Sequence, residues 1–168
     1  VKISKIRAGR KNPGLAPQHL TGVNAIAEIT DAEVNGAVIR SKALDFIPQK
    51  IKPGRYTFDV ADIQPSAGSV SLVFQTVAIP LAFANGDSTV VLRGGTHVKW
   101  SPSVHYLKEV FLPQAAKFGF HGEIGLEKWG WYPVGGGEAI AKVKSVKNIR
   151  PVELVERGKL LSVNGISA

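Results

Sequence analysis

KIRAGRKNPGLAPQHL, residues 5–20, has a counterpart later in the chain, VLRGGTHVKWSPSVHYL, residues 91–107. In both segments an Arg is followed by two small residues, a loop, a Pro and then a His on an apolar helical stretch. Proline suits the first turn of a helix, because its missing N–H would have no partner there. The pattern therefore predicts a strand–loop–helix unit that occurs twice in the chain.

Apolar spacing predicts a helix over about 17–30 and another over 104–118, capped by Ser101 and bent by Pro113. The segment SAGSVSLVFQTVAIPLAFA, residues 66–84, is typical of a buried helix, and a strand should follow at Thr89 to Leu92. Alternating residues predict four further β stretches, within 37–48, 54–60, 122–133 and 137–146. The second copy therefore has the order α-β-α-β-β, and the first lacks the leading helix.

This organisation divides the chain into three parts. Residues 1–60 form a first repeat that is truncated at its start, residues 61–148 form a second repeat, and 149–168 begin something else. We therefore expect the chain to be a fragment, cut at both ends. We see no secretory signal and no unbroken apolar run that would span a membrane, and we expect a cytoplasmic protein.

The 168 residues include 21 Lys and Arg against 13 Asp and Glu, a net charge of +8, and no acidic residue precedes Glu28. A basic edge of this kind favours an anionic partner such as nucleic acid, a nucleotide or another phosphate, and the alternative is a solvated basic surface. With no Cys, the chain has neither disulfides nor thiolate chemistry.

Polar side chains gather where the expected strands end and the helices begin. They are Arg7, Arg10, Gln18, His19, Gln75, Arg93, Thr96, His97, Trp100 and His105. Helix N-termini and Arg side chains both favour phosphate. Structural roles stay open, since Gln75 could cap a backbone group in the core and His19 could bond to backbone. Trp129, Trp131 and Tyr132 could stack on bases or pack on a helix. The His spacing supports no zinc site.

Four stretches, KIRAGRKNPGLAPQHLTGV, SAGSVSLVFQT, RGGTHVKWSPSVHYL and WYPVGGGE, together resemble the RNA 3'-terminal phosphate cyclase family. They match in order and extend the resemblance through about residue 160. The resemblance implies an α/β fold, an α+β sandwich of tandem βαβαββ repeats that enolpyruvyl transferases share. It also implies that residues 149–168 lead into an inserted domain.

The resemblance further implies an ATP-dependent conversion of an RNA 3'-terminal phosphate into a 2',3'-cyclic phosphate. ATP adenylates an enzyme histidine, AMP passes to the 3'-phosphate, and the adjacent 2'-hydroxyl then attacks and expels AMP. The implied partners are ATP and RNA with a 3'-phosphate end, with Mg²⁺ or another divalent cation to offset the triphosphate charge.

Carried over by position, four residues would hold the RNA terminal phosphate or the phosphates of ATP: Arg7, Arg10, Gln18 and His19. Gln75 would lie near the adenylate and Pro102 beside the adenine. The family's glycine-rich N-terminal segment and its nucleophilic histidine match nothing in this chain. We therefore assign no catalytic residue here and expect this chain alone not to form a protein–AMP adduct.

Two other functions stay open. One is a non-catalytic relative that binds RNA in ribosome biogenesis, and the other is enolpyruvyl transfer on the same fold. The set Arg7, Arg10, Gln18 and His19 favours the catalytic branch, and the four matched stretches do not resemble those of the transferases. A nucleophilic histidine in sequence beyond this chain would separate the cyclase from the non-catalytic relative.

Overall fold

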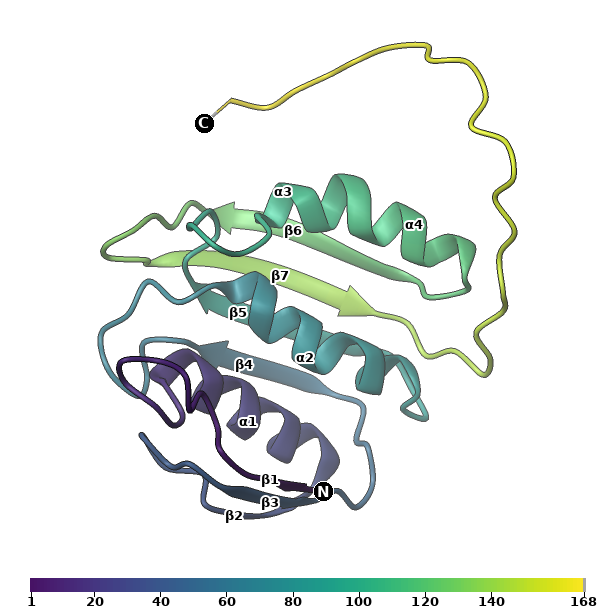
Figure 1. Cartoon of the computed structure of the whole chain (residues 1–168). Helices are drawn as coiled ribbons and strands as arrows, with labels where there is room; N and C mark the ends of the chain where they lie inside the picture. The colour runs from purple at the N-terminus through teal and green to yellow at the C-terminus, as the bar shows by residue number, and fades with distance from the viewer. Residues whose placement is uncertain (168) are drawn as a thin grey trace.

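The computed structural model describes residues 1–167 as a mixed α/β fold with two sheets and three helical segments (Figure 1). The smaller sheet has the order β1-β3-β2, formed by β1 (Lys2–Ile3), β3 (Leu44–Ile47) and β2 (Glu33–Asn35). The larger sheet has the order β4-β5-β7-β6, formed by β4 (Arg55–Asp59), β5 (Ser88–Gly94), β7 (Gly137–Val143) and β6 (Gly122–Lys128).

Strand β4 belongs to the larger sheet, where it pairs with β5 in parallel; β5, β7 and β6 are antiparallel neighbours. The strand expected within 54–60 therefore forms, but it lies in the larger sheet and not beside β2 and β3, the strands that precede it in the chain. The reason is packing, because Phe58 belongs to the same buried cluster as Val90 and Leu92 of β5. The boundaries of the two repeats stay predictions.

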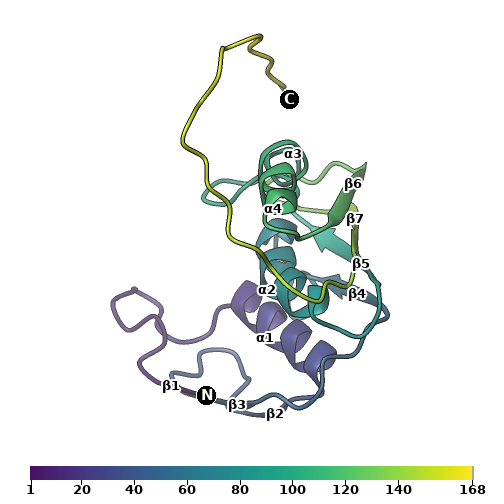
Figure 2. The same ribbon diagram turned by 90° about the vertical axis from the view of Figure 1, so that its right-hand side faces the viewer.

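Helix α1 (Pro17–Thr30) spans the predicted residues. It begins at a proline and ends where Asp31 adopts a left-handed φ of 51°, so that its N–H reaches the carbonyls of Ala27 and Glu28. Figure 2 shows α1, α2 and the third helix in a row on one side of the larger sheet, with the smaller sheet beyond α1.

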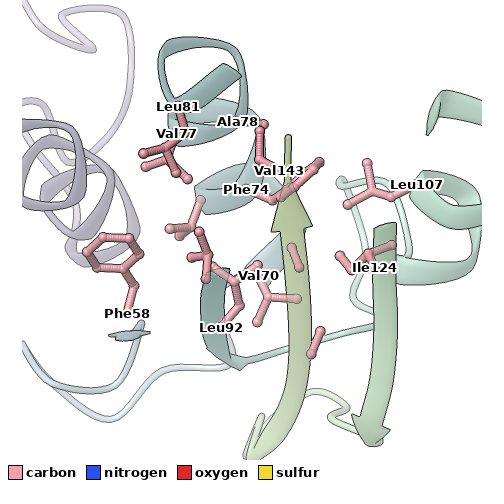
Figure 3. Packing of buried hydrophobic residues seen from close by; sticks show 14 of the residues in the cluster. Phe58, Val70, Phe74, Val77, Ala78, Leu81, Leu92, Leu107, Ile124 and Val143 are labelled. Atoms are coloured by element: carbon pink, nitrogen blue, oxygen red, sulfur yellow. The ribbon is translucent and has the colours of Figure 1, made fainter. Parts of the chain in front are cut away.

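Helix α2 (Val70–Ala82) confirms the predicted core helix. It carries no charged residue, and Val73, Phe74 and Val77 are at most 1% exposed. Figure 3 shows why, since its apolar side chains lie between Phe58 on one side and Val143 on the other. Burial of this apolar surface from water is the main force that holds the helices on the sheet.

The third helix is continuous but not uniform. It comprises α3 (Val104–Tyr106), the π-helical turn η1 (Leu107–Phe111) and α4 (Leu112–Lys117). Ser103, rather than the expected Ser101, caps it by accepting a hydrogen bond from the Tyr106 N–H at 3.1 Å. The widened turn lies before Pro113, which has no N–H with which to continue the regular α-helical pattern.

Residues 144–167 contain no helix or strand, and Figure 1 shows them leaving the body of the molecule. The Val146 N–H bonds to the Ala82 carbonyl and the Arg150 N–H to the Phe118 carbonyl, which attaches the start of this segment. Residue 168 lies outside the described residues. Over residues 1–167, no helix is long and apolar enough to cross a membrane.

Candidate functional site: a basic cavity at three helix N-termini

The N-termini of α1, α2 and α3 meet at one edge of the fold and are joined by hydrogen bonds. The Ser69 N–H, before α2, donates to Gln18 Oε1 in the first turn of α1 at 3.3 Å. Ser71 Oγ donates to the carbonyl of Pro102, before α3, at 2.6 Å and lies 2.6 Å from Ser69 Oγ. Because free N–H groups at helix N-termini carry partial positive charge, this edge favours an anion.

A cavity of about 930 Å³ opens at this edge, and none of its lining residues is Asp or Glu. Arg7, Gln18 and His19 line it from the first copy, and the loop Val98 to Ser101 lines it from the second. The start of α2, with the residues just before it, and the β6–β7 hairpin supply the remaining walls. That hairpin comes close because Gly135, at a positive φ of 76°, lies against the backbone of Ala67.

The Arg7 guanidinium is held by its own loop. Arg7 has a left-handed φ of 50°, and its Nη1 donates to the carbonyls of Asn12 and Gly14, both at 2.9 Å. Among residues 1–167, its Nε and Nη2 make no hydrogen bond. Arginine grips phosphate with two N–H groups at once, so a fixed guanidinium with free donors suits that ligand.

His19 keeps part of its ring exposed at the cavity. Partial burial lowers the pKa of His19 below its usual value, and the nearby charge of Arg7 lowers it further. At neutral pH the ring is therefore neutral and can donate one hydrogen bond while accepting another. Its ring forms no hydrogen bond to backbone within the described chain, so the purely structural role that the sequence left open is not seen.

Two residues that the resemblance assigned to phosphate or adenylate do not line the cavity. Arg10 is exposed in the loop after Arg7, and Gln75 is exposed on α2. The idea that Gln75 caps a backbone group in the core is therefore wrong. Pro102 also lies outside the lining, but its neighbour Ser101 is part of it and Ser71 fixes its carbonyl. The roles of these residues stay predictions.

Arg93 belongs elsewhere, because its Nε donates to Glu138 Oε2 at 2.7 Å on the larger sheet. The side-chain hydrogen bond to Glu138, with that carboxylate's charge, raises the pKa of Arg93. His97 and Trp100 do line the cavity, as their place in the repeated loop suggested. Both residues lie in the loop that follows Arg and two small residues, the pattern that the two copies share.

An aromatic cluster supports the hairpin side of the cavity. His97 Nε2 lies 2.8 Å from His105 Nδ1, and His97 Nδ1 lies 2.9 Å from the Oγ1 of buried Thr96. The rings of Trp129 and Trp131 are parallel with centroids 5.5 Å apart, and His97 contacts both. Burial, and then His105, lower the pKa of His97. Trp129 thus packs against His97 and against His105 of the third helix, whereas Trp131 packs against His97 and lines the cavity.

Sequence reasoning gave no binding role to Ser69, Lys99 or Ser101, which also line the cavity. A small polar residue just before a predicted helix is a usable signal, and it points to Ser69 and Ser101. Lys99 had no comparable signal, since one lysine in a loop is normally a solvated side chain.

A second cavity of about 770 Å³ lies at the opposite end of the larger sheet. Its basic residues, Arg55, Lys142 and Lys144 among them, share the lining with Asp87 and Glu123. Carboxylates next to a bound anion would repel it, so this cavity suits phosphate less well than the cavity lined by Arg7.

Within residues 1–167, no group of three or more His, Asp or Glu side chains could hold a metal ion. Mg²⁺ prefers oxygen ligands, carboxylates above all, and the cavity lining offers no carboxylate. The side chains present therefore do not fit a protein-held Mg²⁺ at this cavity.

The chain is similar to a well-defined group of proteins. The family model described as RNA 3'-terminal phosphate cyclase matches residues 1–163. A protein of Gloeothece citriformis named RNA 3'-terminal phosphate cyclase is 49% identical over 99% of this chain and 49% of its own length. A protein of the same name from Staphylothermus marinus is 46% identical over 99% of this chain and 46% of its own. The chain thus spans about half the length of these curated relatives.

Proposed function

The chain belongs to the RNA 3'-terminal phosphate cyclase family, and on that premise we propose that the protein containing it converts an RNA 3'-terminal phosphate into a 2',3'-cyclic phosphate with ATP. The observation that carries the proposal is the cavity at the three helix N-termini. It gathers Arg7, Gln18 and His19 and has no carboxylate in its lining. The positive charge of such a lining is complementary to two anionic reactants, an RNA 3'-phosphate and a nucleoside triphosphate.

We propose that the fold consists of tandem βαβαββ repeats of the cyclase and enolpyruvyl transferase type. The order β4-α2-β5-third helix-β6-β7 follows that plan. The sheet order supports it further, because β1-β3-β2 in the smaller sheet corresponds to β5-β7-β6 in the larger. In this correspondence α1 follows β1 as the third helix follows β5, so the two helices would hold equivalent places in the two units.

The proposed reaction has three steps. A histidine nucleophile attacks the α-phosphorus of ATP, pyrophosphate leaves, and AMP stays on the histidine. An oxygen of the RNA 3'-phosphate then attacks that AMP, which frees the histidine. Finally the 2'-hydroxyl loses its proton, its oxygen attacks the 3'-phosphorus, and AMP leaves. AMP is a far better leaving group than a phosphate oxygen, which is why ATP is required.

The residues of this chain would position the phosphates rather than break bonds. The free Nε and Nη2 of Arg7 would bind two oxygens of the RNA 3'-phosphate, and the Nε2 amide of Gln18 a third. Neutral His19 would donate to the same group or to a phosphate of ATP. The last step is intramolecular in any case, because the 2'-oxygen and the 3'-phosphate belong to one ribose, and holding the phosphate would keep the two groups aligned for the attack.

The test uses the longer protein with RNA that carries a 3'-phosphate. With ATP, the RNA should become resistant to phosphatase at its 3' end, and one AMP should appear for each end converted. RNA ending in a 3'-hydroxyl should give neither product. An absence of phosphatase-resistant ends, together with ATP-independent binding of RNA, would contradict the proposal and favour the non-catalytic relative.

A further inference from the structure

Three aromatic side chains form a rim around the cavity and take no part in phosphate binding. They are Trp100, in the loop before α3, and Trp131 and Tyr132, in the β6–β7 hairpin. Trp100 is 99% exposed, Tyr132 80% and Trp131 43%. So much apolar ring surface in contact with water around one cavity marks a binding surface rather than a packing defect.

Trp100 is held in an unusual conformation as well as being exposed. Its φ of 67° lies in the left-handed region, which a bulky residue rarely adopts and which costs free energy. The surrounding loop fixes it there, because Ser101 Oγ donates to the Val98 carbonyl at 3.0 Å. A strained loop that directs an indole ring into solvent makes no contribution to the core. The exposed ring is therefore available to a ligand.

Trp131 is supported from behind. Its ring lies parallel to Trp129, and the His97 ring contacts both, with centroid distances of 5.2 Å to Trp131 and 4.5 Å to Trp129. His97 is fixed in turn by Thr96 and His105. The ring therefore keeps its orientation before any ligand arrives, which reduces the entropy lost on binding.

We propose that this aromatic rim, defined as Trp100, Trp131 and Tyr132, stacks the bases of single-stranded RNA on the 5' side of its terminal phosphate. The proposal rests on the proposed function, because it takes the terminal phosphate to lie at Arg7. The basic residues beside the rim indicate which ligand it binds. Lys99 and Arg7 line the same cavity, and with no acidic residue in the lining the rim is suited to a polyanion that carries flat rings.

Base stacking on aromatic side chains depends little on sequence, because every base has a π face. The rim therefore selects single-stranded 3' ends, whose bases are free to leave their neighbours, over ends buried in a duplex. It also predicts that affinity grows over the first few nucleotides before the terminal phosphate and not beyond them.

The test measures how tightly this protein chain binds three ligands. They are a uridine tetranucleotide with a 3'-phosphate, uridine 3'-monophosphate and ATP. Wild-type protein should bind the tetranucleotide at least about tenfold more tightly than the monophosphate. Trp100→Ala should weaken tetranucleotide binding roughly five- to hundredfold and leave monophosphate and ATP binding unchanged. Trp100→Phe, which keeps a ring, should recover most of the loss.

Two further variants make the result decisive. Tyr132→Ala should behave like Trp100→Ala, and the exposed aromatic Phe118, outside the cavity, supplies the control Phe118→Ala with wild-type binding. Unchanged tetranucleotide binding in both rim variants would overturn the inference, as would an equal loss of ATP binding, which would make the rim an adenine site. A 3'-hydroxyl tetranucleotide tests the proposed function separately, because only the phosphate site distinguishes the two ends.

Discussion

At the scale of single residues, the cavity depends on side-chain hydrogen-bond donors that are held in place by hydrogen bonds to the backbone. Gln18 shows this best, because its Oε1 accepts the Ser69 N–H while the residue lines the cavity, which leaves its Nε2 amide available to a ligand. Arg7 is fixed in the same way by two loop carbonyls. The sequence named both residues, since each follows the repeated strand–loop–helix pattern. It also named Arg10 and Gln75, because a motif gives order along the chain but not the direction of a side chain.

Changing Gln18 to Glu should separate folding from binding. A glutamate oxygen can still accept the Ser69 N–H, and a negative charge near a helix N-terminus is favourable, so thermal stability should hold or rise. The same charge repels phosphate, and affinity for 3'-phosphorylated RNA should fall at least about tenfold. Gln114→Glu, exposed on α4, changes the net charge equally and should leave binding as in the wild type. Equal losses in both variants would contradict this account of the cavity.

His97 predicts the direction of a pH effect. Burial, and then His105, lower the pKa of His97 in the folded protein below its value in the unfolded chain. As pH falls through the unfolded value, the unfolded state takes up more protons, so the free energy of unfolding decreases. Thermal unfolding at pH 7.5 and 5.5 measures this. His97→Gln should lose less stability over that interval than the wild type, and an identical loss would show that His97 is not responsible.

At the scale of elements, burial and hydrogen bonding decide what periodicity leaves open. Helices α1 and α2 and strand β5 were predicted, because an apolar stripe or a continuous apolar run defines each of them. Strand β2 was missed, since Glu33, Val34 and Asn35 are too few to show alternation. The partner of β4 was not predicted from the sequence, because pairing depends on which side of Phe58 is buried, and only the assembled core decides that.

The link between α2 and the loop before α3 can be tested with Ser71→Ala. Ser71 is fully buried, and its hydroxyl donates to the Pro102 carbonyl at 2.6 Å. Removing it leaves that carbonyl without its partner and should reduce the free energy of unfolding by about 1–3 kcal/mol. It should also weaken RNA binding, because the loop carries Lys99 to Ser101. Thr76→Ser, which retains the hydroxyl at a half-buried site on α2, should change neither, as measured by denaturant unfolding and RNA titration.

At the scale of the whole molecule, three helix N-termini lie at one edge of the fold, and β1-β3-β2 of the smaller sheet have the same order as β5-β7-β6 of the larger. The repeat in the sequence predicted that edge and the basic residues on it. The hairpin wall was harder to predict, because the hairpin is held at the cavity by the close approach of Gly135 to Ala67 and by the hydrogen bond from the Thr96 N–H to the Gly130 carbonyl. Contacts between segments so far apart in the chain leave no periodic signal.

The position of the phosphate site can be measured directly by amide NMR of this chain during titration with a 3'-phosphorylated uridine tetranucleotide and with its 3'-hydroxyl counterpart. The largest phosphate-dependent shifts should fall on Arg7, Gln18 and Ser69, around the cavity where the three helices begin. Phosphate-dependent shifts centred instead on Arg55, Lys142 and Lys144, at the opposite end of the larger sheet, would contradict the account.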